Sequence, residues 1–159
     1  MNSLGLQRVR EFYEEQAQSL FSYALALTRC RAAAEDAVHE AVCRILSRSA
    51  PPDDLRPYAF RCVRNAAIDA RRRQRPSEPA SVLDHEGTPD GSLERVLYAQ
   101  VERHLLELPT DEMEAVVLHL VDGLTFREIA GVKGSPLNTV ASWYRRGVER
   151  LREKLGGEE

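Results

Sequence analysis

The sequence is poor in cysteine, in aromatic residues and in long apolar runs. Its three cysteines have no Cys-x-x-Cys spacing, so neither a disulfide framework nor a paired-cysteine zinc site is indicated. No apolar run approaches the roughly 20 residues that a membrane span needs, so we expect no membrane insertion. The start of the chain, MNSLGLQRVREFYEEQ, is charged and amphipathic, unlike a secretory signal. A cytoplasmic location is therefore expected.

Signals for catalysis are also missing. There is no glycine-rich phosphate loop, and His85, His104 and His119 have no nucleophile pattern near them. One pair, His39 and Cys43, has the i, i+4 spacing of a helical metal site, but no paired short spacing supplies further ligands. We therefore predict no enzymatic activity, no cofactor and no metal site.

The residues that are abundant predict helices and segregated charge. The chain is 43% hydrophobic and 30% charged, and it is rich in alanine, leucine, glutamate and arginine, which favour helix. Its net charge of −3 averages over two basic blocks, residues 56–75 and 145–154, which flank an acidic stretch at 77–115. Basic blocks of this kind create local fields that attract polyanions such as nucleic acids.

Apolar periodicity and turn residues predict an all-α protein of two small helical bundles. In the first, residues 1–75, helices are expected at about 6–30, 33–47 and 54–73, with Pro51 and Pro52 breaking the chain between the last two. Residues 76–92, rich in proline, glycine and polar residues, read as a flexible linker. In the second bundle, residues 93–159, helices are expected at about 93–108, 111–121, 125–131 and 136–155, with Thr110 capping the second and Ser135 the last.

The last two predicted helices have the form of a helix-turn-helix. Thr125 and Glu128 form a capping box, Gly134 supplies the turn, and Ser135 and Pro136 open the second helix. Its apolar stripe comprises Leu137, Val140, Ala141, Tyr144, Val148, Leu151 and Leu155. Such a helix can enter a DNA major groove, although a merely solvated polar face is the alternative. The residues we assign to DNA contact are Ser135, Asn138, Thr139, Ser142, Trp143, Arg145 and Arg146.

A second polar face is expected on the helix at 54–73. Arg61, Arg64, Asn65 and Arg72 share one side, where guanidinium groups can neutralise phosphates. The alternative is a solvated basic helix end. Asp69 can orient neighbouring arginines or accept a hydrogen bond from a base amino group.

Three segments together resemble the extracytoplasmic-function sigma factors of bacterial RNA polymerase. These are AAAEDAVHEAVCRIL, RPYAFRCVRNAAIDARRR and LPTDEMEAVVLHLVDGLTFREIAGVKGSPLNTVASWYRRGVERLREKL. The resemblance implies that the first bundle binds core RNA polymerase and the minus-ten promoter element. It implies that the second bundle reads the minus-thirty-five element, and that an anti-sigma factor is a further partner.

The resemblance also assigns roles to residues. The minus-ten set is Arg61, Arg64, Asn65, Asp69, Arg71 and Arg72, and residues 47–54 lie where the family captures a flipped base. Asp36, His39 and Glu40 match the family's polymerase-docking pattern Asp-x-x-Gln-Glu, with histidine replacing glutamine. Glu35 reads as an ordinary acidic position.

Several positions depart from the family pattern. Cys43 and Cys62 replace leucine and isoleucine, so both are expected in the core. Asn138 and Trp143 replace glycine and arginine in the recognition helix, which implies an unusual promoter sequence. The competing hypothesis is a stand-alone helix-turn-helix regulator, which would bind promoter DNA without incorporation into polymerase.

Overall fold

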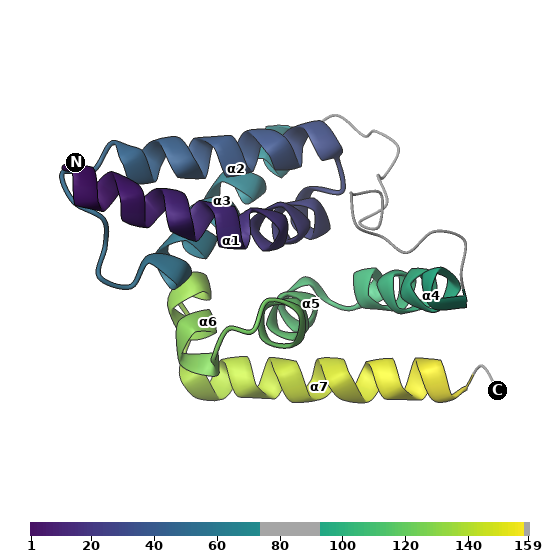
Figure 1. Cartoon of the computed structure of the whole chain (residues 1–159). Coiled ribbons are helices and arrows are strands. Elements are labelled where there is room, and N and C mark those ends of the chain that lie inside the picture. Colours follow the sequence, from purple (N-terminus) through teal and green to yellow (C-terminus); the bar gives the residue numbers. More distant parts are fainter. Residues whose placement is uncertain (74–92, 158–159) are drawn as a thin grey trace. The chain divides into compact units, whose positions relative to one another are not determined.

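A computed structural model describes residues 1–73 and 93–157, with side chains from Ala99 onward in the second range. The described residues form helices and no strands, arranged in two compact units (Figure 1). The predicted all-α fold is therefore confirmed. The predicted linker, residues 76–92, lies outside the described residues, so its bounds remain a prediction. No described helix has the length and apolar character needed to cross a membrane.

The first unit is a bundle of three helices, each packed against the other two. They are α1 (Ser3–Thr28), α2 (Arg31–Leu46) and α3 (Leu55–Arg73). Tyr23 and Phe60, both fully buried, meet in its core with ring centroids 5.8 Å apart. The helix α1 begins three residues before its predicted start because the Asn2 side chain caps it, accepting a 2.8 Å hydrogen bond from the Gly5 amide.

The helix α2 corrects one expectation about the cysteines. Its buried side consists of Ala34, Ala37, Val38, Ala41 and Ile45. Cys43 falls opposite this stripe and is exposed, whereas Cys62 of α3 is buried as predicted. The expectation that Cys43 is buried, which followed from the leucine of the family pattern, is therefore wrong. The helical phase of Cys43 instead accounts for its exposure. Burial raises the pKa of the Cys62 thiol above its ordinary value.

The second unit contains α4 (Leu93–Glu107), α5 (Thr110–Val116), a π-helical turn η1 (Val117–Val121), α6 (Phe126–Lys133) and α7 (Leu137–Gly156), except that Gly131–Gly134 group with the first unit. The predicted single helix at 111–121 is wrong in its last turn, because the Asp122 amide bonds to the Val117 carbonyl, five residues back, at 3.1 Å. Gly123, with φ 73°, then adopts the left-handed turn that its sequence predicts.

The helix caps that the sequence predicts for this unit are partly confirmed. The capping box is confirmed: the Glu128 amide donates to Thr125 Oγ1 at 3.1 Å, and the Thr125 amide donates to Glu128 Oε1 at 3.0 Å. The predicted caps Thr110 and Ser135 are wrong. Pro109 and Pro136 occupy the N-cap positions, and their carbonyls accept the first helical bonds of α5 and α7 at 2.9 and 3.1 Å.

Candidate nucleic-acid interfaces

Three aromatic rings join the two helices of the helix-turn-helix. His119 of η1 lies 4.6 Å from Phe126 of α6 and 4.8 Å from Tyr144 of α7, centroid to centroid, and Phe126 and Tyr144 are 5.2 Å apart. His119 Nδ1 also donates to the Leu124 carbonyl at 2.8 Å. This cluster fixes how α6 and α7 meet. The sequence placed Tyr144 in the core stripe but gave His119 no such role.

The inner side of α7 is held against α5. Val140 and Leu151 are buried, and so is Gly147, which the predicted stripe did not include. The two ends of that stripe were wrongly predicted as core, since Leu137 is 46% exposed and Leu155 is 38% exposed. The apolar side chains at the two ends of α7 are therefore partly exposed, whereas Val140 in its first turn is fully buried.

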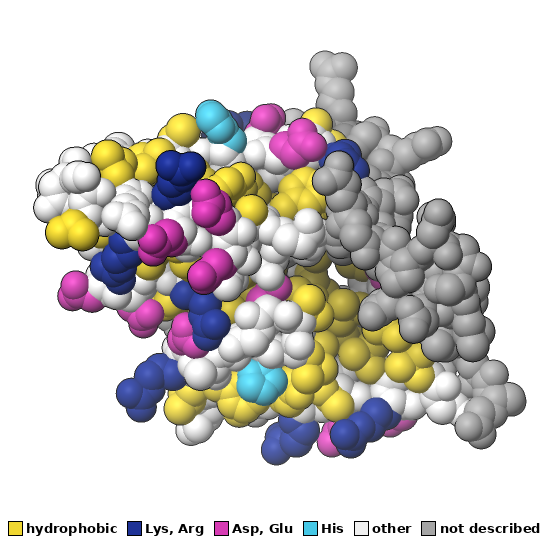
Figure 2. Space-filling model, in the orientation of Figure 1, with side chains coloured by type: hydrophobic (Ala, Val, Ile, Leu, Met, Phe, Trp, Pro, Cys, Tyr) yellow, Lys and Arg dark blue, Asp and Glu magenta, His cyan; other side chains and the backbone are white. Residues whose placement is uncertain are grey.

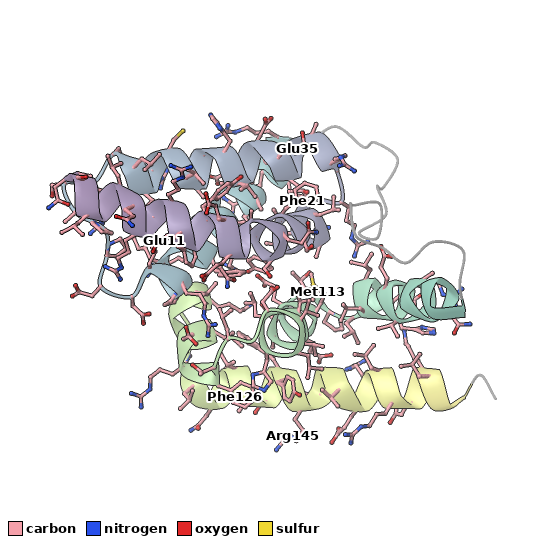
Figure 3. All side chains as sticks on the ribbon, viewed as in Figure 1. Glu11, Phe21, Glu35, Met113, Phe126 and Arg145 are labelled. Atoms are coloured by element: carbon pink, nitrogen blue, oxygen red, sulfur yellow. The ribbon has the colours of Figure 1, made fainter. Side chains whose placement is uncertain are left out.

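The outer side of α7 carries the predicted DNA-contact residues. Asn138, Arg145 and Arg146 are exposed, and the others are half-buried: Ser135, Thr139, Ser142 and Trp143. The helical members, positions 138 to 146, span about 160° of the helix circumference at 100° per residue. Arg145 projects away from α5 (Figure 3). Amide, hydroxyl and guanidinium groups on one accessible side can read base edges and hold phosphates.

Part of the positive charge of the basic block at 145–154 is paired with acidic side chains of the same unit. Arg150 pairs with the buried carboxylate of Glu112 at 3.0 Å, and Lys154 pairs with Glu107 of α4 at 2.8 Å. Lys154 lowers the pKa of Glu107 by hydrogen bonding and by its charge. Arg145, Arg146 and Arg152 are exposed, and Figure 2 shows basic side chains along the outer side of α7. The positive charge offered to a ligand is therefore carried mainly by Arg145 and Arg146 at the middle of the helix and by Arg152 nearer its end.

The predicted minus-ten residues lie on the accessible side of α3. Arg61, Asn65, Asp69 and Arg72 are exposed within about 80° of the helix circumference. Arg64 is half-buried at the edge of this group. Arg71 lies at the other edge of the face from Asp69, and its Nη1 donates to the Leu27 carbonyl at 3.2 Å. The structure thus brings four of the six side chains together and ties the fifth, Arg71, to the end of α1.

The segment between α2 and α3 is fixed by arginines. Arg8 Nη2 donates to the Asp53 carbonyl at 2.7 Å, and the Arg48 guanidinium lies 5.0 Å from the centroid of the Tyr58 ring. A cleft of about 450 Å³ opens between the first turns of α1 and residues 49–51. Gly5 permits this close approach, because a Cβ there would lie 3.1 Å from Pro51 Cδ. No sequence pattern indicates the cleft, because it depends on two segments more than 40 positions apart.

The outer side of α2 is polar and exposed. Asp36, His39 and Glu40 all reach solvent, and Glu35 lies on the side of α2 away from α1 (Figure 3). Glu40 pairs with Arg44 at 3.3 Å, an exposed contact that contributes little to stability. His39 Nε2 lies 3.6 Å from Cys43 Sγ. Within residues 1–73 and 93–157, no group of three or more histidine, cysteine or acidic side chains is placed to hold a metal ion.

Comparison with known proteins identifies the family. The Sigma-70 region 2 family model matches residues 12–77, and the Sigma-70, region 4 model matches residues 98–151. The RNA polymerase sigma factor CarQ of Myxococcus xanthus is 30% identical, with 95% of each chain covered. The ECF RNA polymerase sigma factor SigL of Mycobacterium tuberculosis is 30% identical over 92% of this chain and 88% of its own.

A solved structure shares the fold. The sigma factor RpoE of Bartonella quintana, crystallised with the anti-sigma factor NepR, superposes with a TM-score of 0.67 at 20% identity. That match covers 94% of this chain and 99% of RpoE. Both family models, in order along the chain, and relatives that match along nearly their whole length lead to one conclusion: the chain belongs to the extracytoplasmic-function (ECF) family of RNA polymerase sigma factors.

Proposed function

We propose that this chain binds core RNA polymerase and directs promoter-specific initiation of transcription. The observation that carries the proposal is the match of both sigma regions to relatives named as sigma factors, over 95% of CarQ and 88% of SigL. The chain itself catalyses no reaction; it positions polymerase on DNA, and it acts in the cytoplasm where polymerase works.

The first unit would make two contacts. The exposed Asp36, His39 and Glu40 of α2 dock on polymerase, and the face of α3 around Arg61, Asn65 and Arg72 engages the minus-ten element. These two sets lie on different helices of one bundle, so both can be occupied together. Asp69 belongs to the same α3 face, and Arg64 lies at its edge. Arg71 can contact DNA either while it keeps its hydrogen bond to the Leu27 carbonyl or after that bond breaks.

The cleft beside residues 49–51 is the site that we propose for one unstacked base. It is lined by the first turns of α1 and by residues 49–51 of the segment before α3, it is open to solvent, and both apolar and polar side chains line it. Removing a base from the stack costs a few kcal/mol, which contacts in such a cleft must offset.

The second unit would read the minus-thirty-five element. The accessible side of α7 offers Asn138, Thr139 and Ser142 for base edges, with Arg145 and Arg146 beside them for phosphates. Ser135 lies just before the helix, and Trp143 contributes an aromatic face at its shoulder.

An anti-sigma factor is the further partner that we propose. The related fold of RpoE was solved in complex with the anti-sigma factor NepR, which supports a partner of this class for the present chain. We assign no residues to that contact.

Reconstitution of the holoenzyme tests the proposal. Purified chain and core polymerase would transcribe templates drawn from a random pool, and the RNA start sites would be sequenced. We expect enrichment of one two-part motif, absent with core alone. A stand-alone regulator would instead select DNA without core and would leave core unable to start at the selected sites, which would overturn the proposal.

A further inference from the structure

The side chains of His39 and Cys43 meet on the exposed side of α2. They are four residues apart, which places them one helical turn from each other on the same face. Cys43 is an exposed free thiol, and its Sγ lies 3.6 Å from His39 Nε2. Neither donor atom is occupied by a contact with the core of the bundle.

The distance between these two atoms is that of a tetrahedral chelate. Zinc binds sulfur at about 2.3 Å and imidazole nitrogen at about 2.0–2.1 Å, so two such ligands at a tetrahedral angle lie about 3.5–3.6 Å apart. The 3.6 Å separation in α2 therefore allows one ion to bind both atoms with little rearrangement. A thiol and an imidazole are also the donor types that thiophilic divalent cations select.

Charge around the pair favours a cation. Asp36 and Glu40 are exposed on the same side of α2, one turn before His39 and Cys43 respectively. Arg44, which pairs with Glu40 at 3.3 Å, offsets part of this negative potential.

Contrary to the sequence-based expectation of no metal site, we propose that His39 and Cys43 form a bidentate binding site for a thiophilic divalent cation of the zinc class. On binding, the thiol releases its proton to solvent, the neutral imidazole binds through Nε2, and water fills the remaining positions. With two protein ligands the site is open, so the ion exchanges freely, unlike a closed four-ligand structural site.

The bound ion would alter the docking face of α2. A divalent cation on one thiolate adds a net charge of about +1 beside Asp36 and Glu40. It also immobilises His39, which belongs to the docking set. Cation binding is therefore expected to weaken association with core polymerase; this consequence rests on the proposed function, whereas the metal site itself does not.

Titration of the full chain with Co²⁺ and Zn²⁺ tests the site. Co²⁺ should produce the near-ultraviolet absorption of a thiolate–cobalt bond, and Zn²⁺, measured against a chromophoric chelator, should bind at one equivalent per chain. Cys43→Ser and His39→Ala should each weaken Zn²⁺ binding at least about tenfold. Cys30→Ser, which changes the half-buried cysteine just before α2, should leave it unchanged.

Alkylation provides an independent readout. Zn²⁺ should slow the reaction of Cys43 with iodoacetamide, located by mass spectrometry, and His39→Ala should remove this protection. Absence of the thiolate–cobalt band, or wild-type Zn²⁺ affinity in both Cys43→Ser and His39→Ala, would mean that the pair forms only a thiol–imidazole hydrogen bond and would overturn the site.

The effect on docking is measured separately. Zn²⁺ should weaken core binding by the wild-type chain several-fold more than binding by Cys43→Ser. An equal effect on both would overturn the proposed consequence. Failure of the metal-free chain to bind core would contradict the proposed function, while the titration would still decide the metal site.

Discussion

Gly147 of α7 lies so close to Val116 of α5 that a Cβ on the glycine would be 2.7 Å from Val116 Cγ2 and 3.2 Å from the Glu112 carbonyl oxygen. Both neighbours belong to a packed helix, so they have little room to move. The absence of a side chain at Gly147 thus allows α7 to pack closely against α5. It also brings Arg150, one turn further along α7, to the Glu112 carboxylate.

Gly147→Ala is therefore expected to destabilise the second unit. In an open helical position alanine is the better residue by about 1 kcal/mol, but overpacking here should cost about 1–3 kcal/mol and dominate. Urea unfolding followed by the fluorescence of Trp143, the single tryptophan, reports on this unit. Gly156→Ala is the control, because nothing lies within 4 Å of a Cβ at that position. Equal or greater stability of Gly147→Ala would contradict the close-packing argument.

The capping box gives a second stability prediction. Thr125→Ala removes the acceptor of the Glu128 amide and should lower the free energy of unfolding by about 1 kcal/mol. Thr110→Ala makes the same chemical change at a helix start where no side chain caps the backbone, and it should have the smaller effect. The same fluorescence measurement compares them, and a larger loss for Thr110→Ala would reverse the assignment of the caps.

The ion pair between α4 and α7 predicts a dependence on pH. Lys154 lowers the pKa of Glu107 below the ordinary glutamate value of 4.5, so the unfolded chain binds protons more readily than the folded one in that range. The resulting stability is present above pH 4.5 and is lost as the pH falls through the folded pKa. Lys154→Met should therefore lower the urea midpoint at pH 7, and the difference from wild type should shrink in acid. Arg152→Met, on the exposed side of α7, should show no such pH-dependent difference; a difference for Lys154→Met that is constant from pH 7 to acid would exclude the Glu107 contribution.

The polar side of α7 predicts two kinds of DNA-binding defect. Arg146→Ala should weaken binding to all sequences and reduce the salt slope by about 0.9 for one lost phosphate contact. Asn138→Ala and Trp143→Ala should instead change the preferred minus-thirty-five sequence. Holoenzyme selection from a random pool at two salt concentrations separates these outcomes. An unchanged motif for both Asn138→Ala and Trp143→Ala would remove the base-reading role.

Helical phase could be read from the sequence, and it predicts most of the accessible faces. The side of α3 with Arg61, Asn65 and Arg72 follows from spacing alone, as does the outer side of α7. Phase also places Cys43 on the side of α2 away from Ala37 and Ala41, so periodicity predicts its exposure, whereas the family resemblance predicts burial incorrectly.

Other features depend on contacts that one-dimensional patterns do not contain. The Gly147 approach requires the crossing of α5 and α7, and the cleft beside Pro51 requires the start of α1. The aromatic cluster requires the π-turn that carries His119. Counting charges along the sequence overestimates the positive charge available to a ligand for the same reason, since Lys154 is paired with Glu107, 47 positions away.

Binding to core RNA polymerase tests the central claim most directly. The wild-type chain should bind core with one-to-one stoichiometry in a pull-down or by size-exclusion chromatography. Asp36→Arg combined with Glu40→Arg should abolish that binding while circular dichroism shows the helices intact. Glu35→Arg, a charge reversal at an exposed neighbour outside the docking set, should retain it. A wild-type chain that does not bind core would contradict the sigma-factor function, and core binding that survives the double reversal would contradict the docking face on α2.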